Sequence, residues 1–255
     1  MKSATLLLTV LFMLVFAMNH LVGSDSAAHQ EDFAAHQEKE VGTPVQEGIM
    51  TEQQRKHSKL YKEYSMGQQR IPDELGSGQP GILIKVHTPL AFSDKIPNSF
   101  ESILQKLACD ADALVIGVAK NKASQLTENR DFLFTDYEIS IQEVLKNNPA
   151  QHAVTDGELT VTRPGGAIQL NGKTVEAIDA SFQPLKVGKR YLLFLRFIPT
   201  TGTYKAVNSL SSYQLDDRKV SRLTEQILQL DKDVDDPTSF IASVRTAVAG
   251  GCTER

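Results

Sequence analysis

The sequence predicts a mainly β protein with flanking helices, folded as a single antiparallel β-barrel-like domain over 82–255. Three observations lead to this fold class. Short apolar segments separated by turn residues follow one another between 110 and 216. One pair of segments is joined by Asn171-Gly172, the strongest short hairpin signal. Helical periodicity is confined to the two ends of the region. Hairpin-connected strands with helices at the edges favour a closed or nearly closed antiparallel barrel.

The domain begins with a strand candidate at 81–87, which is followed by a helix. Asn98 is the expected N-cap of this helix, and Glu101 completes a capping pair with it. Apolar residues at 100, 103, 104 and 107 recur with helical spacing, so they build one buried face. The helix leads into an apolar strand at 113–120, which is rich in β-branched residues.

The middle of the domain has the pattern of antiparallel strands. In 132–145 apolar and polar residues alternate, which predicts a half-buried strand with Glu138 pointing outward. Strands follow at 158–163, 167–170 and 173–178, and 182–189 is a loop. Segment 191–198 is apolar on both faces, which places it at the centre of the sheet. Short strands at 203–208 and 212–216 precede two helices, at 223–230 and after Asp236-Pro237.

Composition excludes several classes of protein. The 255 residues include 27 basic and 31 acidic side chains and are 41% hydrophobic, so the chain has enough apolar residues for a packed core. A net charge of −4 offers no concentrated basic face, so we expect no nucleic acid partner. Two cysteines are too few for a disulfide-rich miniprotein or a four-thiolate zinc site.

Residues 1–24 have the pattern of a signal peptide. Lys2 supplies the positive charge, an uncharged apolar run extends over 4–18, and cleavage is expected after Ser24 or Ala28. An uncleaved signal anchor is the alternative, but the run is shorter than the ~20 residues that a spanning helix needs. No later segment is long and apolar enough to span a bilayer. We therefore predict an exported protein, periplasmic or extracellular, with no stable membrane span after signal cleavage.

Residues 25–81 are predicted to be a polar, flexible spacer. The sequence AAHQE occurs at 27–31 and again at 34–38, and Gly and Pro residues punctuate 76–81. Thr51 and Gln54 form a possible capping pair, but few apolar residues follow, so only a transient helix is expected. His29, His36 and His57 lack the HExxH pattern and are interpreted as solvated residues rather than metal ligands.

Cys109 and Cys252 are predicted to form a disulfide. They are the two cysteines of a chain expected to be exported, and a bridge would join the first helix of the domain to the end of the last. The alternative is a reactive thiol, which would need a neighbouring His or a CxxC spacing that the sequence lacks.

Arg163-Pro164-Gly165-Gly166 is the most distinctive short motif of the domain. Because Pro-Gly is itself turn chemistry, a structural turn is the favoured interpretation. The alternative is a binding loop, exposed so that it presents Arg163 to an anionic partner.

No catalytic constellation is apparent in the sequence. Asp110, Asp112, Asp136 and Glu138 supply carboxylates, but nothing in their spacing places two of them in one cleft. The acidic run at 231–236 lacks the glycine and glutamate of a calcium loop, and no GxSxG elbow is present. We therefore predict no catalytic residue, no metal site and no cofactor.

Four segments together resemble a family of exported, uncharacterised bacterial β-barrel proteins. They are ADALVIGVAK, FTDYEISIQEVLKNN, LTVTRPGGAI and VGKRYLLFLRF, and the resemblance covers about 110–210. More distantly, the first two strands are similar to netrin-like modules of the oligonucleotide/oligosaccharide-binding (OB) type of barrel. The chain lacks the N-terminal Cys-x-Cys of the protease-inhibiting relatives, and the resemblance implies no catalytic residue.

The sequence therefore favours an exported, non-catalytic binding module that recognises a protein or a glycan at the cell envelope or outside it. Two alternatives remain open. One is an envelope hydrolase whose carboxylates are brought together only by the fold. The other is a structural or stress protein of the envelope whose stability rests on the Cys109–Cys252 bridge.

Overall fold

The computed structural model describes residues 50–65, 70–73, 75, 80–87, 99–147, 154, 157–224 and 236–252. All of them belong to the second of two compact units into which the chain divides, 1–42 and 43–255. The signal peptide predicted at 1–24 and most of the helix predicted at 223–230 lie outside the described residues. So do His29, His36 and His152.

The described residues are mainly β. The strands are β1 (Ile82–Val86), β2 (Ala113–Leu126), β3 (Leu133–Lys146), β4 (Glu158–Pro164), β5 (Gly166–Leu170), β6 (Lys173–Asp179), β7 (Arg190–Ile198), β8 (Thr203–Ala206), β9 (Ser212–Leu215) and β10 (Val220–Arg222). The helices are α3 (Glu52–Leu60), α4 (Phe100–Asp110) and α5 (Pro237–Ala249), and a short 3-10 helix, η1 (Lys62–Ser65), follows α3.

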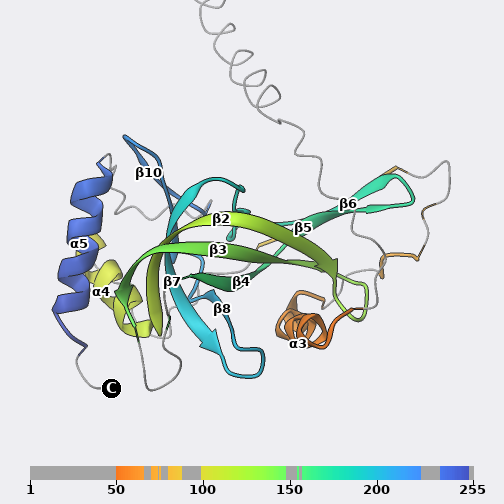
Figure 1. Ribbon diagram of the computed structural model, residues 1–255. Coiled ribbons are helices and arrows are strands. Elements are labelled where there is room, and N and C mark those ends of the chain that lie inside the picture. The colour runs from red at the N-terminus through yellow and green to blue at the C-terminus, as the bar shows by residue number, and fades with distance from the viewer. Residues whose placement is uncertain are drawn as a thin grey trace, which may run out of the picture. The chain divides into compact units, whose positions relative to one another are not determined.

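The strands form two sheets. The larger has the order β10-β9-β7-β2-β3-β4-β8, and the smaller has the order β1-β6-β5. Strand β8 also pairs with β7, so the larger sheet bends back on itself. Figure 1 shows β2 and β3 side by side across the middle of the fold, with α4 and α5 at one end and α3 near the other.

The mainly β class is confirmed. The expectation was a closed or nearly closed antiparallel barrel, and the structure is not a closed barrel. The larger sheet continues past β7 into β9 and β10, and only two residue pairs, both parallel, join β4 to β8. Strands β1 and β6 also run parallel. The physical reason is strand length. Strand β8 has four residues, whereas its neighbours β4 and β7 have seven and nine, so β8 pairs with only part of each.

Local signals placed several elements correctly. Asn171 and Gly172 both have positive φ, 49° and 74°, and join β5 to β6 as the predicted hairpin. Gly117 lies where the paired strands β2 and β3 approach each other closely. A Cβ atom at this position would lie 2.6 Å from the Ile139 side chain and 2.7 Å from the Ser140 carbonyl oxygen. A side chain at this position would push the two long strands apart.

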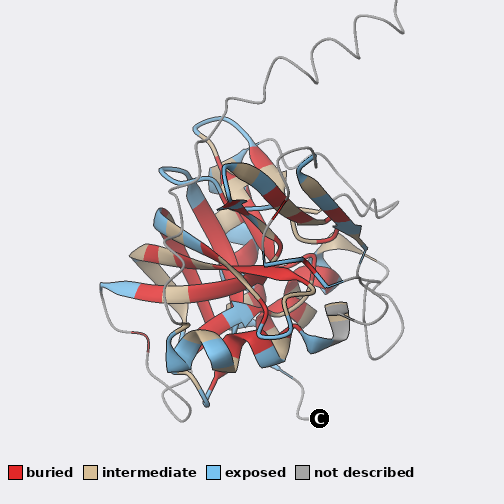
Figure 2. Ribbon diagram, turned by 90° about the vertical axis from the view of Figure 1, so that its right-hand side faces the viewer, coloured by how far each residue is buried: buried red, intermediate tan, exposed pale blue. Residues whose placement is uncertain are grey.

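Strand β7 is central, as its two apolar faces predict. It pairs with β2, β8 and β9. Leu192 and Phe194 pack in one core cluster with α4 and α5, whereas Tyr191, Leu193 and Leu195 pack in a second cluster with β3 and β4. Figure 2 shows that buried residues follow the strands and that exposed residues lie on the outer sides of the helices.

The predicted disulfide is present. Cys109 at the end of α4 is bonded to Cys252, which follows α5, and the two Cα atoms are 5.5 Å apart across a sequence separation of 143. Both cysteines of the chain are used in this bond. Among the described residues, no helix is long and apolar enough to cross a membrane.

Part of the predicted spacer belongs to the folded unit. Tyr61, Ile71 and Leu75 are 5%, 1% and 6% exposed and pack in a third core cluster with Phe132 and Phe134. The Tyr61 ring stacks on the Phe134 ring at 5.5 Å between centroids. The prediction that 25–81 is flexible does not hold for these residues. A few aromatic and polar contacts hold α3 against the sheet, although the helix lacks a wide apolar stripe.

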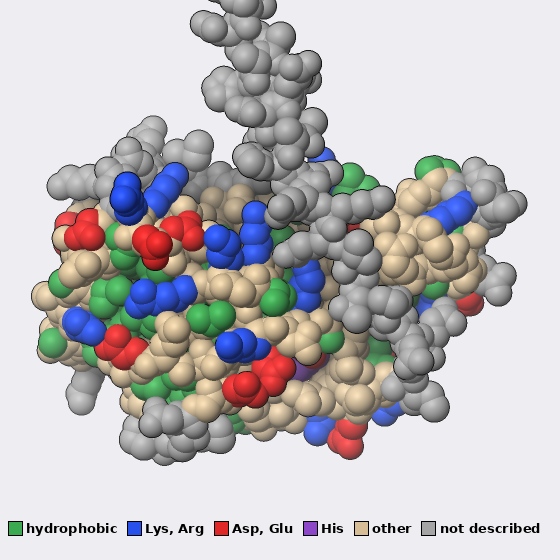
Figure 3. All heavy atoms as spheres, turned by 45° about the horizontal axis from the view of Figure 1, so that its top comes forward, with side chains coloured by type: hydrophobic (Ala, Val, Ile, Leu, Met, Phe, Trp, Pro, Cys, Tyr) green, Lys and Arg blue, Asp and Glu red, His purple; other side chains and the backbone are tan. Residues whose placement is uncertain are grey.

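The surface carries charges of both signs. On the face seen in Figure 3, Lys and Arg side chains lie among Asp and Glu side chains, and its described part has no continuous basic field. This arrangement is what a net charge of −4 built from 27 basic and 31 acidic residues leads one to expect.

Candidate functional site

A groove of about 530 Å³ lies on the surface of the larger sheet, beside the start of α3. Strands β2, β3 and β4 form its base, and the turn before β8 forms one side. The lining residues are Gln53, Asn121, Lys122, Ala123, Asp136, Tyr137, Glu138, Val154, Glu158, Leu159, Thr160, Thr201, Gly202, Thr203 and Tyr204.

Strand register brings the carboxylates of this groove together. Asp136 and Glu138 are two residues apart on β3, so their side chains project from the same face. Glu138 lies opposite Asn121 of β2 and Thr160 of β4. Glu158 is two positions from Thr160, so it is the diagonal neighbour of Glu138. Glu138 therefore faces away from the core as expected, but that outer face is a groove rather than open surface.

Glu138 and Glu158 interact directly. The pKa of Glu138 is raised because its carboxyl group shares a hydrogen bond with that of Glu158 and is repelled by its charge. A hydrogen bond from Asn121 lowers the pKa of Glu138.

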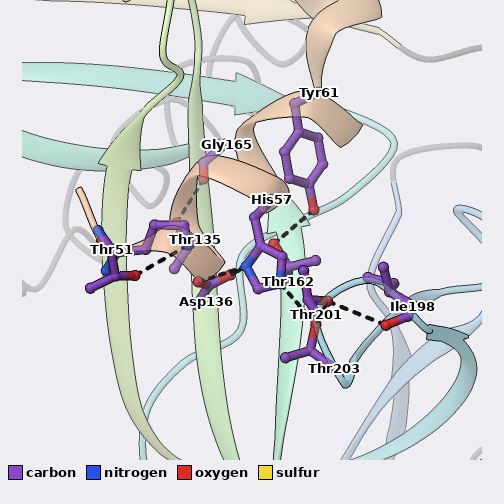
Figure 4. A network of polar contacts seen from close by, with 11 residues as sticks. Thr51, His57, Tyr61, Thr135, Asp136, Thr162, Gly165, Ile198, Thr201 and Thr203 are labelled. Atoms are coloured by element: carbon purple, nitrogen blue, oxygen red, sulfur yellow. Dashed lines mark hydrogen bonds and ion pairs between the residues drawn. The ribbon is translucent and has the colours of Figure 1, made fainter.

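A chain of polar contacts includes Asp136, Thr201 and Thr203 of the groove lining (Figure 4). His57 of α3 is 0% exposed, and its Nδ1 lies 2.9 Å from each carboxylate oxygen of Asp136. Its Nε2 is 2.8 Å from Oγ1 of Thr203, which in turn is 2.7 Å from Oγ1 of Thr201. One turn further along the helix, the Tyr61 hydroxyl donates to Oγ1 of Thr162 at 3.0 Å. These contacts fix α3 against β3, β4 and β8.

The order carboxylate, imidazole, hydroxyl is also that of a nucleophilic triad. In such a triad the hydroxyl must reach the substrate, and the imidazole must pass a proton to the leaving group. Here His57 is completely buried and Thr203 is 4% exposed. The Thr203 hydroxyl is also engaged with Thr201. Because both side chains are buried, the arrangement is better suited to holding α3 in place than to attacking a bound substrate.

The interpretation of Arg163 as an exposed binding residue is wrong. Its side chain is 1% exposed, Nη1 donates to Oγ of Ser212 at 2.7 Å, and Nη2 donates to the Gln183 carbonyl oxygen at 3.0 Å. The guanidinium also lies over the Phe182 ring, and burial lowers its pKa. A turn motif indicates a change of chain direction but not which side of the backbone faces solvent, so the burial was not evident from the sequence.

The rest of the motif makes a sharp structural connection. The chain leaves the larger sheet at Pro164 and enters the smaller sheet at Gly166. Gly165 and Gly166 have φ of 86° and 145°, values that favour glycine. A Cβ on Gly166 would meet the hydroxyl groups of Thr135 and Ser124, so only glycine fits there.

Sequence reasoning missed most of the groove. His57 was interpreted as solvated, yet it is buried against residues 79 and 146 positions away. Its one local signal was the Thr51–Gln54 capping box, which the structure confirms and which predicts the helix but not its docking. His87, by contrast, is exposed, with Nδ1 3.5 Å from the Ser181 hydroxyl. Among the described residues, no group of three or more His, Cys, Asp or Glu side chains is placed to hold a metal ion.

No protein-family model matches the chain, and a search of curated proteins finds no similar sequence. The resemblance to exported β-barrel proteins therefore stays a prediction, and the functional argument rests on the groove itself.

Proposed function

We propose that the chain is an exported, non-catalytic binding module whose groove binds a glycan. The observation that carries this proposal is the chemistry of the groove. Eleven of its fifteen lining residues have side chains with hydrogen-bonding groups, namely carboxylates, amides, hydroxyls and one ammonium. Sites for most small ligands are predominantly apolar with a few polar groups. A lining that is mainly polar suits a glycan, because a sugar carries a hydroxyl group on most of its carbon atoms.

The strand order supports the same proposal. Strands β2, β3, β4, β8 and β7 each pair with two others of this set. We propose that they correspond to a partly open OB-type barrel, in which β3 and β4 are the second and third strands. Barrels of this type bind oligonucleotides and oligosaccharides on that face and on the loop between the fourth and fifth strands. Here the groove lies over β3 and β4 and includes Thr201 and Gly202 of the loop between β7 and β8.

The charge and shape of the groove favour a glycan over the other polymers. Nucleic acid binding depends on neutralising phosphates. The groove presents Asp136, Glu138 and Glu158 with Lys122 as its one cationic side chain. Protein interfaces have apolar, aromatic centres, and peptides commonly add to free sheet edges. This groove has a polar centre and runs over strands that are paired on both sides.

Two features support export. A disulfide such as Cys109–Cys252 persists in oxidising compartments and is rare in the cytosol of most organisms. The signal peptide predicted at 1–24 would direct the chain to such an oxidising compartment. The ligand is accordingly expected among envelope or extracellular glycans.

The test is glycan binding by the mature chain 25–255, first on an array of envelope and extracellular glycans and then by isothermal titration calorimetry. Asn121→Ala and Thr160→Ala remove hydrogen-bonding groups from the groove, and each is expected to weaken binding about tenfold. Gln169→Ala on β5, outside the groove, is the matched control and should leave affinity unchanged. Absence of binding to every glycan, or equal affinity in all variants, would overturn the proposal.

One observation favours a second candidate, a hydrolase: the Asp136–His57–Thr203 chain of contacts. A fluorophosphonate probe that labels the native chain but not the Thr203→Val variant would establish a nucleophile and favour this candidate.

A further inference from the structure

The chain of contacts that passes through His57 begins and ends in the groove. Asp136 and Thr201, the two ends of this chain, both line the groove. His57 and Thr203 lie between them and are 0% and 4% exposed. The state of a buried imidazole is therefore connected, through hydrogen bonds, to a hydroxyl group that a ligand can reach.

The positions of the protons follow from what each group can donate. A carboxylate only accepts hydrogen bonds, so Nδ1 of His57, 2.9 Å from each oxygen of Asp136, carries a proton. In a neutral imidazole Nε2 is then an acceptor. The Thr203 hydroxyl, 2.8 Å away, donates its one proton to Nε2 and has none left for Thr201. The 2.7 Å contact between the two threonines is accordingly a hydrogen bond that Thr201 donates.

The surroundings of Thr201 support this order. A second acceptor near its hydroxyl is the Ile198 carbonyl oxygen, but it lies 3.4 Å from Oγ1, beyond the usual range for a hydroxyl donor. That oxygen already accepts from the backbone N–H groups of Thr201 and Gly202, at 3.1 and 3.0 Å. Because a carbonyl oxygen has two lone pairs, both are taken. Thr203 is thus the better acceptor for the Thr201 proton, and the Thr201 oxygen keeps a lone pair for the groove.

We infer that His57 is a positioning residue that acts through Thr203 to hold the Thr201 hydroxyl as a hydrogen-bond acceptor, so that the groove selects a glycan hydroxyl that donates at this point. The inference rests on the proposed glycan-binding function and names the polarity of one contact in that same groove. A hydroxyl that donates onward is a stronger acceptor, because hydrogen bonds in a chain polarise one another. A ligand hydroxyl that donates to Thr201 extends this chain by one member.

The opposite order would require a second proton on His57. A charged imidazole would donate from Nε2 to Thr203, Thr203 would donate to Thr201, and Thr201 would present its proton to the groove. The two orders give one position of the groove opposite hydrogen-bonding character. They differ by a proton on one buried nitrogen, which can be observed directly.

The first measurement locates the protons of His57 in the ligand-free mature chain 25–255 at neutral pH. Long-range ¹H–¹⁵N correlation spectra of the chain labelled with ¹⁵N-histidine distinguish a protonated ring nitrogen from an unprotonated one. We expect a proton on Nδ1 and none on Nε2. Thr203→Val removes the donor to Nε2 and keeps nearly the same shape, so the signals that move in this variant identify His57. A proton on Nε2 would overturn the inference.

The second measurement tests whether this order matters for binding, with the array of envelope and extracellular glycans as the probe. Thr201→Val removes the acceptor and should weaken binding about tenfold, whereas Thr201→Ser should restore it. Thr203→Val leaves the Thr201 hydroxyl in the groove without its fixed direction and should weaken binding about fivefold. Thr174→Val on β6, outside the groove, is the matched control. Saturation with a bound glycan should also shift the Nε2 signal of His57, which does not line the groove.

The outcomes separate the inference from the proposed function. Urea unfolding of each variant distinguishes lost binding from lost folding, and Thr201→Val, at a partly exposed turn, should keep the native midpoint. Native binding by Thr201→Val, with weakened binding by Asn121→Ala and Thr160→Ala, would overturn the inference alone. An Nε2 signal that does not respond to a bound glycan would do the same. Failure with every glycan refutes the proposed function, and with it the selection of a glycan hydroxyl, while the His57 spectrum still decides the order of the hydrogen bonds.

Discussion

Removal of the residues before 80 is predicted to destabilise the domain severely. The truncated chain 80–255 would lose Tyr61, Ile71 and Leu75, which are 5%, 1% and 6% exposed in the folded unit. Burial of a large apolar side chain stabilises by roughly 1.5–3 kcal/mol, so the three together contribute on the order of 5–9 kcal/mol. A domain of this size is stable by only about 5–15 kcal/mol in total.

Polar contacts add to this loss. Without α3, the Asp136 carboxylate loses His57 and the Thr162 hydroxyl loses Tyr61. Each contact that is removed from a buried polar group costs about 1–3 kcal/mol where water does not replace it. The truncation therefore removes most of the stability that the domain has.

The assay is urea unfolding of the chains 50–255 and 80–255, followed by far-ultraviolet circular dichroism. The shorter chain should lack a cooperative transition or show one at much lower urea. Two point variants of the longer chain locate the effect: Ile71→Ala should cost about 2–5 kcal/mol and Tyr61→Phe about 1 kcal/mol. A cooperative transition of 80–255 with the midpoint and slope of 50–255 would refute the reasoning and restore the spacer interpretation.

Three further predictions concern other parts of the fold. Reduction of the disulfide, or Cys109→Ser, should lower the urea midpoint; loop-closure entropy for a separation of 143 residues sets an upper value of about 5 kcal/mol. Arg163→Met should cost roughly 3 kcal/mol in the same assay, because it leaves Ser212 and the Gln183 carbonyl without their donor; unchanged stability would contradict its structural role. Burial raises the pKa of Tyr191 from 10.0 to about 12, so the folded state holds this proton longer and its contribution to stability is lost as pH rises from 10 to 12. Tyr191→Phe should make stability fall less steeply over that range, as measured by urea unfolding at each pH.

The features that the sequence predicted correctly have local causes. The Asn171-Gly172 hairpin follows from backbone conformations that these two residues adopt readily. The central position of β7 follows from two apolar faces in one segment. The Cys109–Cys252 bond follows from there being two cysteines and a predicted signal peptide.

The features that the sequence did not predict depend on register and on contacts between distant segments. Glu138 and Glu158 become neighbours only because β3 pairs with β4 in one register, and a shift by one residue would move one of them to the other face. His57 is buried only because α3 docks where Asp136 and Thr203 are available as partners. The sequence of α3, a polar helix of nine residues, contains no pattern that predicts where it docks.

The role of α3 decides which experiments are informative about the groove. Its Gln53 lines the groove, while His57 and Tyr61 hold the helix to the sheet. Truncation before 80 would therefore remove part of the groove and much of the stability together, so lost binding in that chain would not locate the ligand. Glu138 and Glu158 are different, because they lie at the surface and belong to none of the three core clusters. Their replacement by glutamine keeps size and shape while removing charge, so a change in ligand preference in that variant reports on the groove alone.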